Sequence, residues 1–394
     1  MRFALIADTF PPLRNSGAVQ LRDLAREIAR NGHELVVMLP APELSENWKV
    51  EEFEGATVLR LRAPQTKDVR HVRRTLAEFA MPFAMRRGLR KSPFASCKWD
   101  GVIWYSPSIF HGPLVKYIKQ ASDCKSYLII RDIFPEWAAD MELMGRGPAF
   151  RFFRSIARYQ YSVADVIGVQ TPGNLPYFRA WASQPGRCLD VLPNWLGEAG
   201  KKECAIQIDQ TSLVGRKIFV YAGNMGVAQN MDKILQLAER LKHRDDMGFL
   251  FVGRGSEAGR LKSQAKRNGL KNVLFYDEID PDEIPALYNQ CHVGIVSLDP
   301  RHKSHNIPGK FLTYMQCGLP ALANVNAGND LVSLIREHEV GIACENSDPE
   351  QLAEAACQII SESDAIEKRR RCLNLFQNKF SVTNTANSII NHFI

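Results

Sequence analysis

The sequence lacks the features of a membrane-spanning or metal-stabilised protein. No apolar run approaches the roughly 18 residues that a transmembrane helix needs. The first apolar run is interrupted at Asp8 and no small-residue cleavage site follows, which favours a core strand over a signal peptide. The nine cysteines are scattered, with no C-x-x-C pair and no Cys/His spacing typical of zinc ligands. We therefore expect a reducing, cytoplasmic location and no metal site.

The composition is that of an ordinary globular protein with room for two domains. The chain has 394 residues, of which 45% are hydrophobic and 24% charged. Short apolar runs, such as 34–39 and 218–222, alternate with segments of helical periodicity, such as 21–28. Alternating strands and helices predict an α/β protein with doubly wound parallel sheets, whose ligands bind at the carboxyl ends of the strands.

A polar stretch without periodicity divides the chain. Residues 195–215 contain three glycines and several charged residues, which indicates an interdomain linker. We therefore expect one Rossmann-like domain over 1–196, a second over 197–375, and a final helix over 376–394 that packs back on the first domain.

The net charge of +7 is concentrated in one segment. Residues 67–98 hold nine Lys/Arg and only two acids. The apolar residues interleaved with these charges are Phe79, Met81, Phe83, Met85 and Phe94. Such alternation favours a membrane-surface segment, with a plain solvated face as the alternative. Nucleic acid is disfavoured because no nucleic-acid-binding motif accompanies the patch.

Two loops of the first domain are candidate site elements. A long loop rich in Pro follows Asp8 and ends at Gly17, where a helix begins whose N-terminus favours an anion. A second loop, 131–137, follows the apolar strand 127–130 and reads Arg-Asp-Ile-Phe-Pro-Glu-Trp. Charged residues at a strand end are costly unless they are paired or used. The alternatives are a structural Arg–Asp pair or acceptor binding with base chemistry.

The second domain offers its own loops at strand ends. Residues 221–226 form a small-residue turn whose backbone N–H groups suit a diphosphate. The run 253–259 is not G-x-G-x-x-G and does not follow the first strand of its domain, which disfavours a nicotinamide enzyme. Lys310 begins a short helix that stops at Gly318, where its charge suits phosphate. Asn329 stands at a further helix N-terminus.

These motifs together resemble the family 4 retaining glycosyltransferases of the GT-B fold. The resemblance covers nearly the whole chain. It rests on the loop ending in Gly17, on 131–136, on Leu-Pro-Asn at 192–194, on 223–226, and on the run from Pro308 to Pro320. More narrowly, 131–137 and 306–320 resemble bacterial O-antigen and capsule transferases that move N-acetyl-L-fucosamine.

The resemblance implies a fold and a reaction. Two doubly wound Rossmann-like domains would face a central cleft. The donor would be a nucleotide-sugar, with uridine the commonest base in the family. The residues expected to bind it are Gly17 of the first domain and, in the second, Gly223, Asn224, Gly226, Arg254, Ile279, Lys310, Thr313 and Asn329. The acceptor side would use Arg131, Asp132 and Glu136, with Asp132 holding or deprotonating the acceptor hydroxyl. No bound cofactor and no metal are implied.

The chain departs from the family at two places. Many members carry a histidine where this chain has Arg131-Asp132, and many carry a Glu-x7-Glu motif. Here His305 and Thr313 stand at the two glutamate positions, so a threonine hydroxyl replaces the carboxylate that binds the donor ribose in the family. This departure puts ribose recognition in question more than phosphate binding.

The function predicted from the sequence is retaining transfer of a sugar to a lipid-linked saccharide in the synthesis of a surface polysaccharide. The enzyme would work as a peripheral protein on the inner face of the cytoplasmic membrane, reached through 67–98. Two alternatives stay open. One is a nucleotide-sugar epimerase or hydrolase, which would turn over donor without an acceptor. The other is a non-catalytic subunit that binds nucleotide without turnover.

Overall fold

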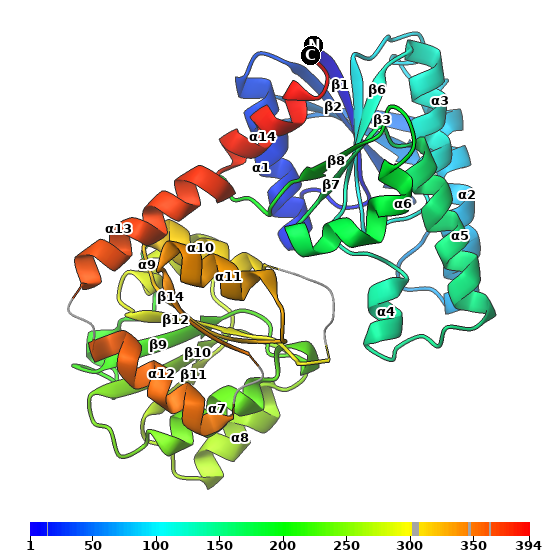
Figure 1. The fold of residues 1–394 in the computed structure, drawn as a ribbon. Helices are drawn as coiled ribbons and strands as arrows, with labels where there is room; N and C mark the ends of the chain where they lie inside the picture. Colours follow the sequence, from blue (N-terminus) through cyan, green and yellow to red (C-terminus); the bar gives the residue numbers. More distant parts are fainter. Residues whose placement is uncertain (14, 302–306, 346–347, 362–363) are drawn as a thin grey trace. The chain divides into compact units, whose positions relative to one another are not determined.

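The computed structural model describes residues 1–394 except 14, 302–306, 346–347 and 362–363. The chain forms two compact units (Figure 1). Unit 1 comprises Met1–Pro193 and Val382–Ile394, and unit 2 comprises Asn194–Ser381. Each unit is built on one sheet of mainly parallel strands, as the alternation of strands and helices predicts.

The sheet of unit 1 has eight strands in its described part, in the order β3-β4-β2-β1-β5-β6-β7-β8. The strands are β1 (Arg2–Ile6), β2 (Glu34–Ala41), β3 (Trp48–Phe53), β4 (Ala56–Arg62), β5 (Gly101–Tyr105), β6 (Lys125–Ile129), β7 (Val166–Val169) and β8 (Cys188–Val191). The helices are α1 (Ser16–Arg30), α2 (His71–Leu89), α3 (Gly112–Ser122), α4 (Glu136–Asp140), α5 (Pro148–Val163), the 3-10 helix η1 (Pro172–Phe178), α6 (Arg179–Ala182) and α14 (Val382–Asn391). All strand pairs are parallel except β3 with β4.

The final helix, α14, belongs to unit 1 and packs against α1 (Figure 1). Thr383 Oγ1 donates a hydrogen bond of 2.7 Å to Glu27 Oε1 of α1. The rings of Phe393 and Phe3 lie 5.1 Å apart, which joins the end of the chain to β1. The preceding turn of π-helix, η5 (Phe376–Phe380), lies in unit 2 instead, where Phe380 is buried. The segment expected as one final helix is therefore shared between the two units.

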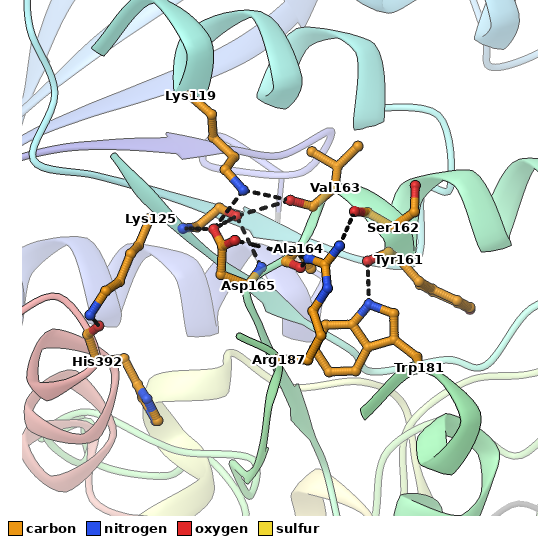
Figure 2. Close-up of polar contacts among 11 residues, drawn as sticks. Lys119, Lys125, Tyr161, Ser162, Val163, Ala164, Asp165, Trp181, Arg187 and His392 are labelled. Carbon is orange, nitrogen blue, oxygen red and sulfur yellow. Dashed lines mark hydrogen bonds and ion pairs between the residues drawn. The ribbon is translucent and has the colours of Figure 1, made fainter. Parts of the chain in front are cut away.

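A charged cluster ties together the amino ends of three strands in unit 1 (Figure 2). Asp165, just before β7, accepts hydrogen bonds from the backbone N–H and the hydroxyl of Ser126 in β6, both at 2.8 Å. Lys119 Nζ lies 2.6 Å from the same carboxylate, and Arg187 beside β8 donates to backbone carbonyls of 162 and 164. Ligands of open α/β sheets bind at the carboxyl ends of the strands. We therefore assign this cluster to stability rather than to the site.

The sheet of unit 2 has six parallel strands in its described part, in the order β11-β10-β9-β12-β13-β14. The strands are β9 (Lys217–Ala222), β10 (Met247–Val252), β11 (Val273–Tyr276), β12 (Val293–Ser297), β13 (Ala321–Val325) and β14 (Gly341–Glu345). The α-helices are α7 (Met231–Arg240), α8 (Ala258–Arg267), α9 (Ile284–Tyr288), α10 (Gly309–Cys317), α11 (Asp330–His338), α12 (Pro349–Ser361) and α13 (Ala365–Leu375). Three 3-10 turns complete the unit: η2 (Ile208–Gln210), η3 (Val227–Gln229) and η4 (Pro281–Glu283).

The stretch interpreted as a linker is part of unit 2. Ile206, Ile208 and Leu213 are buried in the core of that unit, and the two units divide between 193 and 194. Buried side chains separated by polar residues give no clear period, which is why the segment resembled a linker. The stretch 195–215, interpreted as an interdomain linker, is therefore the beginning of unit 2.

Candidate active site

The loop after β9 is held by backbone contacts that only glycine permits. Gly223 has φ +140°, a conformation that L side chains rarely adopt. A Cβ added to Gly253 in the neighbouring loop would lie 2.2 Å from the carbonyl oxygen of Gly223. Met225 N donates to Arg254 O at 2.7 Å, which joins the two loops further. At the point of contact, therefore, neither loop has a side chain. The backbone of the Gly253 loop packs directly against the backbone of the Gly223 loop.

Side chains within this turn fix its shape. The amide of Gln229 accepts hydrogen bonds from Gly226 N at 3.1 Å and from Asn224 Nδ2 at 3.2 Å. The hydroxyl of Tyr221 donates to Asn224 O at 2.5 Å. Asn224 and Gly226, both expected to contact the donor, are thus arranged as a preformed turn at a strand end, which is a suitable place for an anion.

Lys310 lies beside the Gly223 loop because a buried tyrosine anchors its helix, α10. Tyr314, one turn after Lys310, donates to the carbonyls of Val220 in β9 and Ile295 in β12 at 3.2 and 3.0 Å. The ammonium of Lys310 stands 4.7 Å from the centre of the Tyr221 ring. A Cβ at Gly223 would be 3.7 Å from Lys310 Cε and 4.0 Å from its Nζ. The structure thus brings together two motifs that are far apart in the sequence.

The charge of Lys310 has no counter-ion among the described carboxylates. Burial lowers the pKa of its ammonium to about 8, with no acidic side chain acting to raise it. A lysine in this state gains more from an incoming phosphate than one that is already paired, because the phosphate supplies the missing charge.

Two predicted donor residues near α10 and α11 have local structural partners. Thr313, which shares a helix face with Lys310, donates from Oγ1 to Gly309 O at 3.3 Å. Asn329 is buried and caps α11, because its Oδ1 accepts from Leu331 N at 3.0 Å. A ligand bound at this position would therefore contact the N-terminus of α11 more than the side-chain amide of Asn329. His305, the partner position of Thr313 in the expected motif, lies outside the described residues.

The residues expected around the base lie after β10 and β11. Arg254 is mostly exposed and forms a 3.1 Å ion pair with Glu278, whose side chain is also exposed. Ile279 is partly buried and packs against the core of unit 2. A D-x-D triplet is present here at Asp280 and Asp282, but Lys202 pairs with both carboxylates, at 2.5 and 3.9 Å. No group of three metal-ligating side chains occurs among the residues that the structure describes.

In unit 1, Gly17 lies in the first turn of α1, beside the end of β5. Asn15 caps the helix by accepting from Ala18 N at 2.8 Å. A Cβ at Gly17 would lie 3.3 Å from the hydroxyl of Tyr105, the last residue of β5. Burial raises the pKa of that hydroxyl to about 12, so it stays a neutral hydrogen-bonding group.

Arg131 is used mainly to hold the chain together. Its guanidinium donates to the carbonyls of Leu192 at 2.7 Å and Pro193 at 3.4 Å, and it is also hydrogen-bonded to Tyr105. These contacts join the ends of β5, β6 and β8. The geometry favours the structural alternative for this residue, and its role in catalysis stays a prediction.

Asp132 and Glu136 have different surroundings. Asp132 is exposed at the end of β6. Glu136 begins α4 and lies 3.4 Å from Arg154 Nε, and its partial burial raises its carboxyl pKa despite that cation. It lines a cavity of about 290 Å³ whose other polar walls include Arg154, Arg158, Tyr161, Ser162, Tyr177 and Gln184. Glu136 therefore lines a hollow of unit 1 that has both polar and apolar walls.

His111, which precedes α3, was not expected from the sequence to be a site residue. Its ring is fully buried, and neither nitrogen has a hydrogen-bond partner among the described residues. Burial lowers the pKa of the ring, so it is neutral near pH 7, while the charge of Asp8 acts in the opposite direction. A single histidine without metal-ligand spacing gives no signal in a sequence. The one clue in the sequence was its position after β5, on the side of the sheet where the strands end.

We expect Gly253→Ala to lower the stability of unit 2 and its binding of nucleotide-sugar, because the substitution would distort the Gly223 loop. The added methyl would overlap the Gly223 carbonyl, and φ is +138°, so the cost should be about 2 kcal/mol of unfolding free energy or more. Thermal unfolding with and without nucleotide-sugar measures both effects. Gly259→Ala in α8 is the matched control, because nothing lies within 4 Å of its Cβ. Equal behaviour of the two variants would contradict this support role.

Known proteins resemble this chain in sequence and in structure. The family model "Glycosyl transferases group 1" matches residues 216–362. The probable glycosyltransferase WbjE of Pseudomonas aeruginosa is 25% identical over 61% of this chain, and the match spans 60% of its own length. The putative colanic acid biosynthesis glycosyl transferase WcaI of Escherichia coli K12 is 24% identical over 82% of this chain and 81% of its own length.

The fold is shared over the whole chain. The crystal structure of WaaG, a glycosyltransferase involved in lipopolysaccharide biosynthesis, has a TM-score of 0.66 at 14% identity and covers 99% of both chains. The two sheets described above and this likeness show that the chain has the GT-B fold, and the match over residues 216–362 relates unit 2 to the group 1 glycosyltransferases.

Proposed function

We propose that this enzyme transfers a sugar, with retention, from a UDP-linked donor to a lipid-linked saccharide acceptor. The observation that carries the donor half is the ammonium of Lys310 beside the Gly223 turn, without a described counter-ion. That arrangement supports binding of a diphosphate. In this proposal unit 2 holds the donor and unit 1 holds the acceptor.

The chemistry follows from where charge develops. As the bond from the sugar to the diphosphate breaks, negative charge grows on the leaving oxygen. Lys310 and the backbone N–H groups of the Gly223 turn would stabilise it. The acceptor hydroxyl attacks the face that the diphosphate leaves, and its proton goes to Asp132 or to the departing diphosphate. No metal is needed for this charge balance.

The substrate assignment rests on the relatives. The name of WcaI refers to colanic acid biosynthesis, and that of WaaG to lipopolysaccharide biosynthesis. By analogy we propose a step in surface polysaccharide assembly at the cytoplasmic face of a membrane. The resemblance of 131–137 to N-acetyl-L-fucosamine transferases makes UDP-N-acetyl-L-fucosamine the first donor to test.

The test is a donor screen followed by a turnover assay. We expect UDP-sugars to raise the melting temperature more than GDP- or dTDP-sugars do. The best donor, isotopically labelled in its sugar, is then incubated with a bacterial lipid extract and without it. Label in the lipid fraction supports the proposal. Donor loss without extract would indicate a hydrolase or epimerase, and tight nucleotide binding without turnover would indicate a binding subunit.

A further inference from the structure

Helix α2 carries two apolar stripes, and one of them is exposed. Met81, Met85 and Leu89 are buried in the core of unit 1. The second stripe consists of Val72, Leu76, Phe79 and Phe83, which are 76, 66, 53 and 49% exposed. Met81 and Met85 were predicted to lie on the membrane-facing surface with the aromatic residues, and this part of the membrane prediction is wrong because those methionines face the core.

The exposed residues form one continuous row. They recur at intervals of four, three and four residues, which places them on a single face of a helix. The rings of Phe79 and Phe83 lie 6.1 Å apart, so they also contact each other on the outside of the molecule. Single exposed apolar residues are common, whereas a row of four on one helix face indicates an interaction surface.

Four basic residues continue the row at the end of α2. Arg86, Arg87, Arg90 and Lys91 are exposed, and with Phe83 they line an open hollow of about 550 Å³. None of the four is paired with a described carboxylate, unlike Arg74, which lies 2.8 Å from Glu78 in the same helix. Arg86 stacks over the ring of Tyr117 in α3, which holds its guanidinium at the surface. The hollow therefore combines unneutralised positive charge with an aromatic edge.

We propose that this face of α2, made of the four exposed apolar residues and the four basic residues that follow them, docks on a bilayer with anionic headgroups. The basic residues would contact lipid phosphates, while Phe79 and Phe83 reach the boundary between headgroups and acyl chains. A second copy of the chain is a poorer occupant, because a symmetric contact would bring two unpaired basic clusters together. No helix in the described residues is long and apolar enough to cross a membrane, so the contact proposed is with the surface.

The inference does not depend on the donor or the acceptor, so it is tested without either. The full chain is sedimented with vesicles of phosphatidylcholine alone or mixed with phosphatidylglycerol, at low and high salt. We expect binding to the mixed vesicles at low salt, at least tenfold weaker binding at high salt, and little binding to neutral vesicles. A wild-type chain that stays in the supernatant with anionic vesicles at low salt would overturn the proposal.

Two variants separate the parts of the surface. Serine at Arg86, Arg87, Arg90 and Lys91 should lower the apparent affinity for mixed vesicles at least tenfold. The matched control places serine at four exposed basic residues of unit 2, which are Lys262, Lys266, Arg267 and Lys271. It removes the same charge and should change binding less than twofold. Equal losses in the two variants would mean that net charge alone attracts the chain, which contradicts a specific surface.

The apolar row is tested by Phe79→Ser combined with Phe83→Ser. Both side chains are about half exposed, so the fold should survive, and circular dichroism checks it. We expect the binding that persists at intermediate salt to be lost, because the charges alone are screened there. Light scattering gives the competing outcome. A wild-type dimer that the double variant converts to a monomer would show that a second copy covers this face.

Discussion

Asp132→Asn is expected to lower sugar transfer by about 100-fold or more, which is the usual effect of losing a general base. Binding of the nucleotide-sugar should stay intact. The carboxylate is exposed at the end of β6, where an acceptor hydroxyl can reach it, and asparagine keeps its size while removing its basicity. Transfer of labelled sugar to the lipid extract measures the effect, and thermal shift with the donor measures binding.

The control for Asp132 is a neighbouring carboxylate in different surroundings. Glu136 is partly buried beside Arg154 and lines a hollow of unit 1, so Glu136→Gln should change the apparent affinity for the acceptor more than the turnover rate. If Asp132→Asn also abolishes donor binding or lowers the melting temperature by several degrees, Asp132 is a structural residue. If both variants lose turnover equally, the two carboxylates act together.

The cores of both sheets were predictable because buried parallel strands are continuous apolar runs. Residues 2–8 and 218–222 are examples, and both form fully or largely buried strands. The pair β3 and β4 was missed for the opposite reason. β3 lies at the sheet edge and reads Trp-Lys-Val-Glu-Glu-Phe, with charges that suit an exposed edge but break the apolar pattern. Edge strands therefore carry the weakest sequence signal here.

The site was predictable where a motif needs a particular backbone. Gly223 and Lys310 belong to separate motifs, each with a reason to bind phosphate, and in the structure a Cβ built on Gly223 would lie 3.7 Å from Lys310 Cε. Side-chain partners were not predictable. Nothing in the sequence shows that Arg131 holds Leu192 and Pro193, or that His111 is buried without a partner, because both facts depend on how distant segments pack.

Lys310→Met is expected to make the ligand-free protein more stable and to abolish its response to nucleotide-sugar. An ammonium whose pKa falls from the ordinary 10.5 to about 8 on folding opposes folding below pH 8. Removing the ammonium should raise the free energy of unfolding by on the order of 1–3 kcal/mol. The upper value corresponds to the whole pKa change. The same change removes the charge that binds diphosphate, so donor binding should weaken at least tenfold.

The pH dependence tests this assignment, because ligand-free stability and donor affinity should change with pH in opposite directions. Between about pH 8 and 10.5 the unfolded lysine binds more protons than the folded one, so ligand-free stability should gain a component that rises with pH. Donor affinity should fall over the same range, because a neutral amine must first take up a proton to bind phosphate. Lys310→Arg is the matched control, since arginine stays charged and should bind the donor almost independently of pH in this range. Calorimetric titration with an intact nucleotide-sugar from pH 7 to 9.5 measures the affinity and the proton uptake together. Wild-type affinity that stays constant across that range would show that the Lys310 ammonium does not contact the diphosphate.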